Sequence, residues 1–225
     1  MQEIINALYI IASPIGNLGD LTERAKFIIS EVDVIVCEDT RVTSKLLNHI
    51  GCKKKLISCN AHNESNKSKY LIELLKGGNS IGYLSDAGTP GISDPGNLLV
   101  EQVVEAGFEV IPIPGPSSIT TILSICGFNL SKGFYFEGFL PRKDGKLKKL
   151  IQTIIVDLKV PLIAFESPYR IKKSLSKIAE FSPTLKCCLG RELTKLHEEI
   201  IRGNISEVAA KKITEKGEFV IVLSA

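Results

Sequence analysis

The order in which two kinds of segment follow one another limits the fold of this chain most strongly. Short runs rich in Val, Ile and Leu alternate with longer segments whose apolar residues recur at helical spacing. Strands that alternate with helices build a mostly parallel sheet with helices on its faces. In the first half we expect strands over residues 7–12, 33–38, 55–58, 80–84 and 108–113, and helices over 21–30, 43–51, 64–78 and 97–107.

The pattern starts again after the segment PIPGPSSITTILSICGF. Strands are expected over residues 134–139, 159–165, 185–193, 198–203 and 217–225, and helices over 145–158, 168–181 and 204–217. The later strands have short connections, which favour antiparallel pairing. We therefore predict an α/β protein of two lobes, an N-terminal domain over residues 1–115 and a C-terminal domain over 116–225. A ligand cleft is expected between them.

Composition argues against a membrane-spanning protein, a secreted protein and a metal-binding protein. Apolar residues make up 44% of 225 residues, enough for an ordinary core. The net charge of +3 means that a polyanionic partner must be bound by local clusters of cations. Because no apolar run reaches membrane-spanning length and the N-terminus lacks a basic start, we expect a cytoplasmic protein without a signal peptide. Six cysteines and three histidines lack ligand spacing, so we expect reduced, mostly buried thiols and no metal.

One turn is richer in glycine and proline than a plain connection requires. The stretch SDAGTPGISDPG, residues 85–96, lies between an expected strand and an expected helix. A conventional short turn needs one glycine and one proline at most, whereas this one holds three glycines and two prolines. We therefore expect its backbone to contact a ligand. Asp86 can accept a hydrogen bond from a ligand ammonium, and Asp94 from neighbouring amides.

Two further turns contain glycine at the same end of the expected sheet. In ASPIGNLGDLTERA the glycines are spaced G-x-x-G, a poor match to the dinucleotide-binding fingerprint, and a plain turn is an equal alternative. In PIPGPSSITTIL a serine can cap the helix that follows, whose free amides suit a carboxylate or a hydroxyl. Open α/β sheets bind ligands at the carboxyl ends of their strands, where these three turns are expected to meet.

Three polar motifs follow expected strands. CEDTR contains Asp39 and Arg41, which either cap and flank a helix or position a polar substrate. FESPYR places Glu166 and Arg170 directly after a strand. GRELTKLHEE is either a solvated charged turn or, because its first charges follow an apolar strand, part of a site.

Together the motifs SPIGNLGDLT, CEDTR, SDAGTPGISDPG, PGPSS, FYFEGFLPRK, FESPYR and GRELTKLHEE resemble the tetrapyrrole-methylase superfamily of S-adenosylmethionine-dependent methyltransferases, in its ribosomal RNA branch. The resemblance implies two α/β lobes with the cofactor held between them, and a homodimer. It also implies transfer of a methyl group to a cytidine ribose 2′-hydroxyl in the decoding region of small-subunit (16S) ribosomal RNA, within the 30S subunit. Longer members continue past the position of Ala225 into a helical tail.

The resemblance implies which residues bind the cofactor, and the chemistry of the transfer adds candidates for a base and for phosphate-binding cations. The expected cofactor-binding residues are Leu84, Asp86, Gly88, Thr89, Ser117, Ser118, Ile119 and Ala164. A general base would help the ribose hydroxyl to attack, and the candidates are Asp39, Glu166, Glu192 and Lys195, with Glu192 or Lys195 favoured. A carboxylate serves if burial raises its pKa, and a lysine if its pKa is lowered. Cations expected to bind phosphate or to organise these carboxylates are Arg41, Arg170 and Arg191, and further basic runs lie at 53–55, 142–149 and 172–173.

Other functions are weighed against this one. Another methylase of the superfamily, acting on a tetrapyrrole or a protein side chain, is the nearest alternative. A nicotinamide-dependent oxidoreductase is opposed by the glycine spacing. A non-catalytic RNA-binding module would have little use for three turns shaped for a cofactor.

Overall fold

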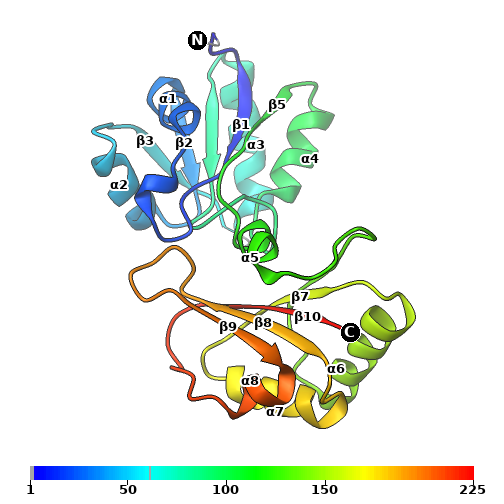
Figure 1. Ribbon diagram of the computed structural model, residues 1–225. Helices are drawn as coiled ribbons and strands as arrows, with labels where there is room; N and C mark the ends of the chain where they lie inside the picture. Colours follow the sequence, from blue (N-terminus) through cyan, green and yellow to red (C-terminus); the bar gives the residue numbers. More distant parts are fainter. Residues whose placement is uncertain (1–2, 61) are drawn as a thin grey trace. The chain divides into compact units, whose positions relative to one another are not determined.

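The computed structural model describes residues 3–60 and 62–225 (Figure 1). The chain divides into two units between Ser117 and Ser118, called unit 1 and unit 2 below. Within the described residues each unit has its own five-stranded sheet. The α/β class expected from the alternation of segments is confirmed.

The sheet of unit 1 is parallel throughout. Its order is β3-β2-β4-β1-β5, and every neighbouring pair runs parallel. Strands β2 and β4 are buried along their whole length, as apolar runs without polar alternation predict. The strands are β1 (Ala7–Ile11), β2 (Val34–Cys37), β3 (Lys55–Ser58), β4 (Ile81–Leu84) and β5 (Glu109–Ile113).

Helices cover both faces of this sheet (Figure 1). On one face Ile28 of α1 and Leu47 of α2 pack with Ile35 of β2. On the other face the side chains of α3 and α4 pack with Tyr83 of β4 and its neighbours. The elements are the short 3-10 helix η1 (Leu18–Asp20), α1 (Glu23–Glu31), α2 (Thr40–His49), α3 (Glu64–Lys76) and α4 (Asn97–Glu105).

The helix positions create a switch point at β4. The connections from β1 and β2 lead to helices on one face, whereas the connection from β4 leads to α4 on the opposite face. Strand β4 lies between β1 and β2 in the sheet. At the carboxyl end of β4 the connection therefore leaves toward one face, while the connections of both neighbouring strands leave toward the other. Open α/β sheets bind ligands at such points.

Unit 2 has a mixed sheet of order β6-β7-β10-β8-β9. Strand β6 runs parallel to β7 and the other pairs are antiparallel, as the short connections predicted. The side chains of α6, α7 and α8 build the core on one face, and α5 packs on β8 and β10. The strands are β6 (Tyr135–Phe139), β7 (Leu162–Glu166), β8 (Lys186–Arg191), β9 (Glu199–Asn204) and β10 (Phe219–Ser224). The helices are α5 (Ser118–Cys126), α6 (Asp144–Ile151) with the π turn η2 (Gln152–Asp157), α7 (Ile171–Phe181) and α8 (Ile205–Ala210).

The helix expected over residues 204–217 was wrong beyond Ala210. The backbone becomes extended at Lys211, and Ile213 is buried in the core instead of continuing a helical face. Gly217 then adopts a φ of +89°, which an α-helix does not allow.

Two expectations from composition can be compared with the structure. Five of the six cysteines are buried and Cys52 is half-buried, which confirms mostly buried thiols. Among the described residues no helix has both the length and the apolar character needed to cross a membrane.

Candidate functional site

The loops that follow β1 and β4 are joined by main-chain hydrogen bonds. The Ser13 N–H donates to the Gly88 carbonyl at 2.9 Å, and the Gly88 N–H donates back to Ser13 at 3.1 Å. The buried Ser13 hydroxyl also donates to the Ser85 carbonyl at 3.1 Å. Gly88 has a φ of +86°, a conformation that favours glycine, and a Cβ there would lie 3.3 Å from the Ile15 side chain.

The turn after β5 meets the same edge. The Ala12 N–H donates to the Ile113 carbonyl at 3.1 Å, and the Thr89 hydroxyl donates to the Pro116 carbonyl at 3.2 Å. Gly115 lies so close to β1 that a Cβ would stand 2.9 Å from the Ala12 Cβ. The prediction that three glycine-bearing turns meet at the carboxyl edge of the sheet is confirmed.

A cavity of about 260 Å³ opens at this edge of unit 1. It lies between the loop after β1, the end of β4 and helix α2. Its wall combines apolar side chains with the hydroxyl residues Ser13, Thr43 and Ser85 and with the side chains of Lys45 and Asp86, so it offers an apolar surface for a ring and both signs of charge for polar groups of a ligand. The lining includes Pro14, Leu18, Val42, Leu84, Ser85 and Asp86.

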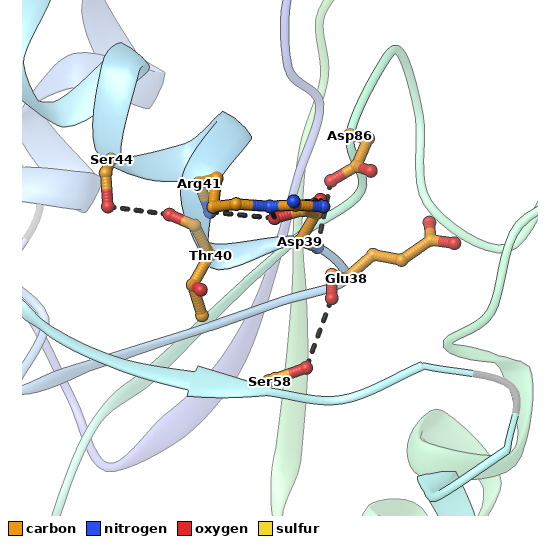
Figure 2. Close-up of polar contacts among 7 residues, drawn as sticks. All are labelled: Glu38, Asp39, Thr40, Arg41, Ser44, Ser58 and Asp86. Carbon is orange, nitrogen blue, oxygen red and sulfur yellow. Dashed lines mark hydrogen bonds and ion pairs between the residues drawn. The ribbon is translucent and has the colours of Figure 1, made fainter.

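Asp39 and Arg41 form a pair at the start of α2 (Figure 2). The Asp39 carboxylate caps the helix by accepting from the Arg41 N–H at 2.8 Å, and it accepts from the guanidinium of Arg41 at 2.5 to 3.1 Å. These hydrogen bonds lower the pKa of Asp39 to about 2. The Asp39 N–H in turn donates to the Asp86 carboxylate at 3.0 Å. The structure therefore brings CEDTR against the loop after β4, with Asp39 capping α2.

Two carboxylates beside this pair differ from Asp39. Burial raises the pKa of Glu38, and the charges of Asp86, Asp94 and Asp39 add to the effect. Burial likewise raises the pKa of both Asp86 and Asp94. Among the described residues the Glu38 carboxylate has no hydrogen bond and no ion pair. Figure 2 shows its side chain extending away from Asp39. Glu38 was not among the candidate bases named from the sequence. Its position directly after a buried strand is the signal that predicts its partial burial.

A buried hydroxyl on β4 lacks a partner. Tyr83 is fully buried, and among the described residues its hydroxyl has no hydrogen-bond partner. Burial raises its pKa, with Cys59 and Glu64 adding to the effect. Its ring lies against Gly96, where a Cβ would stand 2.9 Å from the ring. Gly96 therefore lets the loop after β4 pass over this ring.

In unit 2 the FESPYR motif forms a buried anchor. The Glu166 carboxylate accepts from the Ser167 N–H at 2.7 Å and from the Ser174 hydroxyl at 2.5 Å, and it pairs with Arg170 at 3.1 Å. Arg170 also donates to the Leu140 carbonyl at 2.7 Å. Both charges are thus satisfied inside unit 2, and a role for either in catalysis or RNA binding stays a prediction.

Ala164 lies on β7, two residues before this anchor. Its side chain belongs to the core of unit 2. Its neighbours Ile163 and Phe165 pair with Phe136 and Phe139 of β6, and the register shifts between these two pairs. The pairing of β6 with β7 is therefore irregular at Ala164, whereas on the other side Ala164 pairs in regular register with Ile221 of β10, and its role in cofactor binding stays a prediction.

The GRELTKLHEE motif forms a tight turn between β8 and β9. Glu192 and Thr194 have φ values of +51° and +67°, a rare conformation for residues with side chains. The Glu192 carboxylate accepts from Lys195 at 2.9 Å and from the Glu218 N–H at 3.0 Å. Gly217 has a φ of +89°, and a Cβ there would stand only 2.5 Å from the Glu192 side chain, so the turn favours glycine at this position.

These contacts set the charges of the two favoured base candidates. Burial alone would raise the pKa of Glu192, but hydrogen bonds from Lys195 and the Glu218 N–H outweigh it and lower the pKa. Burial alone would lower the pKa of Lys195, but its bonds to Glu218 and Glu192 outweigh it and raise the pKa. The conditions under which our sequence analysis favoured them, a raised carboxylate pKa or a lowered lysine pKa, are therefore not met.

The remaining residues named from the sequence lie in two places. Arg191 ends β8 and donates to the Glu199 carboxylate at 3.0 Å. Ser117 ends unit 1, while Ser118 and the buried Ile119 open α5. The structure thus gathers Leu84, Asp86, Gly88 and Thr89 in unit 1, and Glu166, Arg170, Arg191, Glu192 and Lys195 at one end of the unit 2 sheet.

Comparisons with known proteins agree with this architecture. The family model described as Tetrapyrrole (Corrin/Porphyrin) Methylases matches residues 7–209. A Borrelia garinii subsp. bavariensis protein called Ribosomal RNA small subunit methyltransferase I is 44% identical over 96% of this chain and 98% of its own. Proteins of the same name from Thermotoga maritima and Neisseria meningitidis are 43% and 40% identical, again over 96% of this chain, and over 97% and 75% of their own. The chain therefore belongs to the tetrapyrrole methylase family.

Proposed function

We propose that this protein transfers a methyl group from S-adenosylmethionine to the 2′-hydroxyl of a cytidine ribose in small-subunit ribosomal RNA. The observation that carries the proposal is the match, over nearly the whole chain, to relatives named Ribosomal RNA small subunit methyltransferase I. The protein would act in the cytoplasm, as a homodimer, on the decoding region of assembled 30S subunits.

The carboxyl edge of unit 1 fits the proposed cofactor. The hydrogen-bonded turns hold Gly88 in a conformation that favours glycine, and a side chain there would press on Ile15. The cavity offers Leu84 and other apolar groups for a ring, and Asp86 for an ammonium. S-adenosylmethionine, when bound, supplies a methyl group activated on a sulfonium. Thr89 and, from the rest of the chain, Ser117, Ser118, Ile119 and Ala164 complete the set of residues proposed to hold it.

The chain's own contribution is orientation and removal of a proton. Holding donor and acceptor in line supplies most of the acceleration for such a transfer. The ribose hydroxyl must lose its proton, for which a carboxylate with a raised pKa and a free oxygen is suited. Glu38 meets both conditions, whereas Asp39, Glu166, Glu192 and Lys195 are each held in an ion pair. We therefore place Glu38 ahead of these four as the base.

The function is tested with small ribosomal subunits that lack the modification. Purified protein and labelled S-adenosylmethionine should place label on the small-subunit RNA, and primer extension should map it to one ribose. Label on a base, on protein or on a tetrapyrrole would contradict the proposal. Failure of the cofactor to bind in calorimetry would favour a non-catalytic RNA-binding module.

A matched pair of variants tests the cofactor site itself. Gly88 and Gly78 have φ values of +86° and +87°, so alanine strains the backbone equally at both. Only Gly88 lies at the site, and Gly78 has open space around its Cβ position. We expect Gly88→Ala to weaken cofactor binding at least tenfold and Gly78→Ala to leave it unchanged. Equal affinities would exclude this edge as the cofactor site.

A further inference from the structure

Two apolar side chains stand uncovered at one end of the unit 2 sheet. Tyr169 is 92% exposed and Leu196 is 94% exposed. Exposed apolar residues are common, but these two lie in loops that follow the two strands next to β10, on either side of Phe219. Phe219 of β10 pairs with Glu166, just before the loop of Tyr169, and with Arg191, just before the loop of Leu196.

Internal bonds hold these loops in place. Arg170, next to Tyr169, is tied to Glu166 and to the Leu140 carbonyl. Lys195, next to Leu196, is tied to Glu192 and Glu218. Both tips are therefore presented on fixed loops, and a tyrosine side chain, which has only two rotatable bonds, loses little conformational entropy when it binds a partner.

Exposed cations lie near the loop of Tyr169. Arg142 and Lys143 follow Leu140, whose carbonyl accepts from Arg170, and Lys173 lies in the first turn of α7. All three are exposed, and within residues 3–60 and 62–225 none forms an ion pair. Arg170 and Arg191, which our sequence analysis expected to bind phosphate, instead pair with Glu166 and Glu199.

We propose that this end of unit 2 binds a single-stranded stretch of the substrate RNA, with Tyr169 stacked on an unpaired base. Leu196 contacts the apolar face of a second nucleotide, and Arg142, Lys143 and Lys173 bind phosphates. An aromatic ring among cations is the combination that binds single-stranded RNA, because bases offer a stacking face and the backbone offers charge. The inference rests on the proposed function for the identity of the RNA.

Direct binding to unmodified small ribosomal subunits tests the stacking. Tyr169→Ala should weaken binding about 5- to 150-fold, because stacking of one base on an aromatic ring is worth about 1–3 kcal/mol. Tyr169→Phe keeps the ring and should stay within about threefold of the wild type. The matched control Tyr70→Ala removes a tyrosine that is 44% exposed on α3 and should change nothing. Melting temperature should be unchanged in the two Tyr169 variants, and S-adenosylmethionine affinity should be unchanged in all three variants.

The phosphate contacts are tested by the salt dependence of the same binding. Each lost contact lowers the slope of log affinity against log salt by about 0.7 to 0.9. The triple variant Arg142→Gln, Lys143→Gln, Lys173→Gln should therefore reduce the slope by about two. The double variant Lys211→Gln, Lys212→Gln, which removes exposed cations after α8, should leave it unchanged.

Several results would overturn the inference. Unchanged binding by Tyr169→Ala would exclude stacking. A change of oligomeric state in sedimentation, with RNA affinity kept, would instead assign the surface to contact between copies of the chain. The wild type could bind the subunits, and Tyr169→Ala could weaken that binding, while no methyl group is transferred to the RNA. That result would contradict the proposed function and support the RNA-binding surface. If the wild type does not bind the subunits, both fail.

Discussion

Replacement of Glu166 tests whether this residue stabilises the fold or acts as the general base. The side chain of Glu166 is fully buried and serves three partners, namely the Ser167 N–H, the Ser174 hydroxyl and the Arg170 guanidinium. Glu166→Ala leaves the buried Ser174 hydroxyl unsatisfied, at about 1–3 kcal/mol, and also leaves the partly buried Ser167 N–H and Arg170 without their carboxylate. Arg170 keeps its bond to the Leu140 carbonyl and is partly exposed, which limits its share.

We therefore expect Glu166→Ala to lower the free energy of unfolding by about 3–5 kcal/mol, the usual cost of breaking a buried ion pair. This is a large share of the 5–15 kcal/mol typical of a folded protein. Glu166→Gln keeps the shape and should cost about 2 kcal/mol. Ser174→Ala, the control that removes one donor to the charged carboxylate, should cost about 1.5–3 kcal/mol.

Urea unfolding followed by circular dichroism measures these differences. Methyl transfer is then assayed at a temperature where each variant is folded. Because Glu166 is an anchor in our reasoning, Glu166→Gln should keep methyl transfer within about tenfold of the wild type. The reasoning is refuted if Glu166→Gln unfolds like the wild type while its methyl transfer falls a hundredfold or more, the loss typical of a general base.

Three other predictions concern single carboxylates. Glu38→Gln should reduce methyl transfer at least a hundredfold while cofactor affinity is kept, and unchanged turnover would remove Glu38 as the base. Since the folded-state pKa of Glu38 is raised, its ionisation opposes folding above the unfolded pKa, so Glu38→Gln should raise the melting temperature at pH 7 but not at pH 4. The hydrogen bond from Ser80 lowers the pKa of Asp33, so its stabilising effect is present above pH 4 and lost as the pH falls below it. The stability difference between wild type and Asp33→Asn, measured by urea titration across this range, should shrink on acidification, and a constant difference would contradict the assignment.

The sequence was sufficient to predict what local pattern determines. The apolar runs that became β2 and β4 have no polar alternation, so burial on both faces followed from the letters alone. The glycine-bearing turns could be assigned to one edge because parallel strands place all their carboxyl ends together. The switch point at β4 follows from strand order, which distant contacts decide and local pattern does not.

The charge state of the site could not be predicted, because it depends on distant partners. Lys195 meets Glu218, which is 23 positions away in the chain, and this contact reverses the direction of the expected pKa shift. Glu166 was named as a candidate base because it follows a strand directly, and the motif does not reveal its buried hydrogen bond from Ser174 on the following helix. The helix expected after Asn204 ended early because burial of Ile213 outweighed the helical preference of its neighbours.

The hydrogen bond from Ser13 to Ser85 also has a consequence for biosynthesis. The two residues lie 72 positions apart, so the first loop of the chain cannot reach its final conformation until β4 has been made and paired. Contacts of such long range slow folding, because a large loop must close before they form. During translation the nascent N-terminal segment must therefore wait for later residues, and ligand uptake should follow, rather than guide, assembly of the parallel sheet.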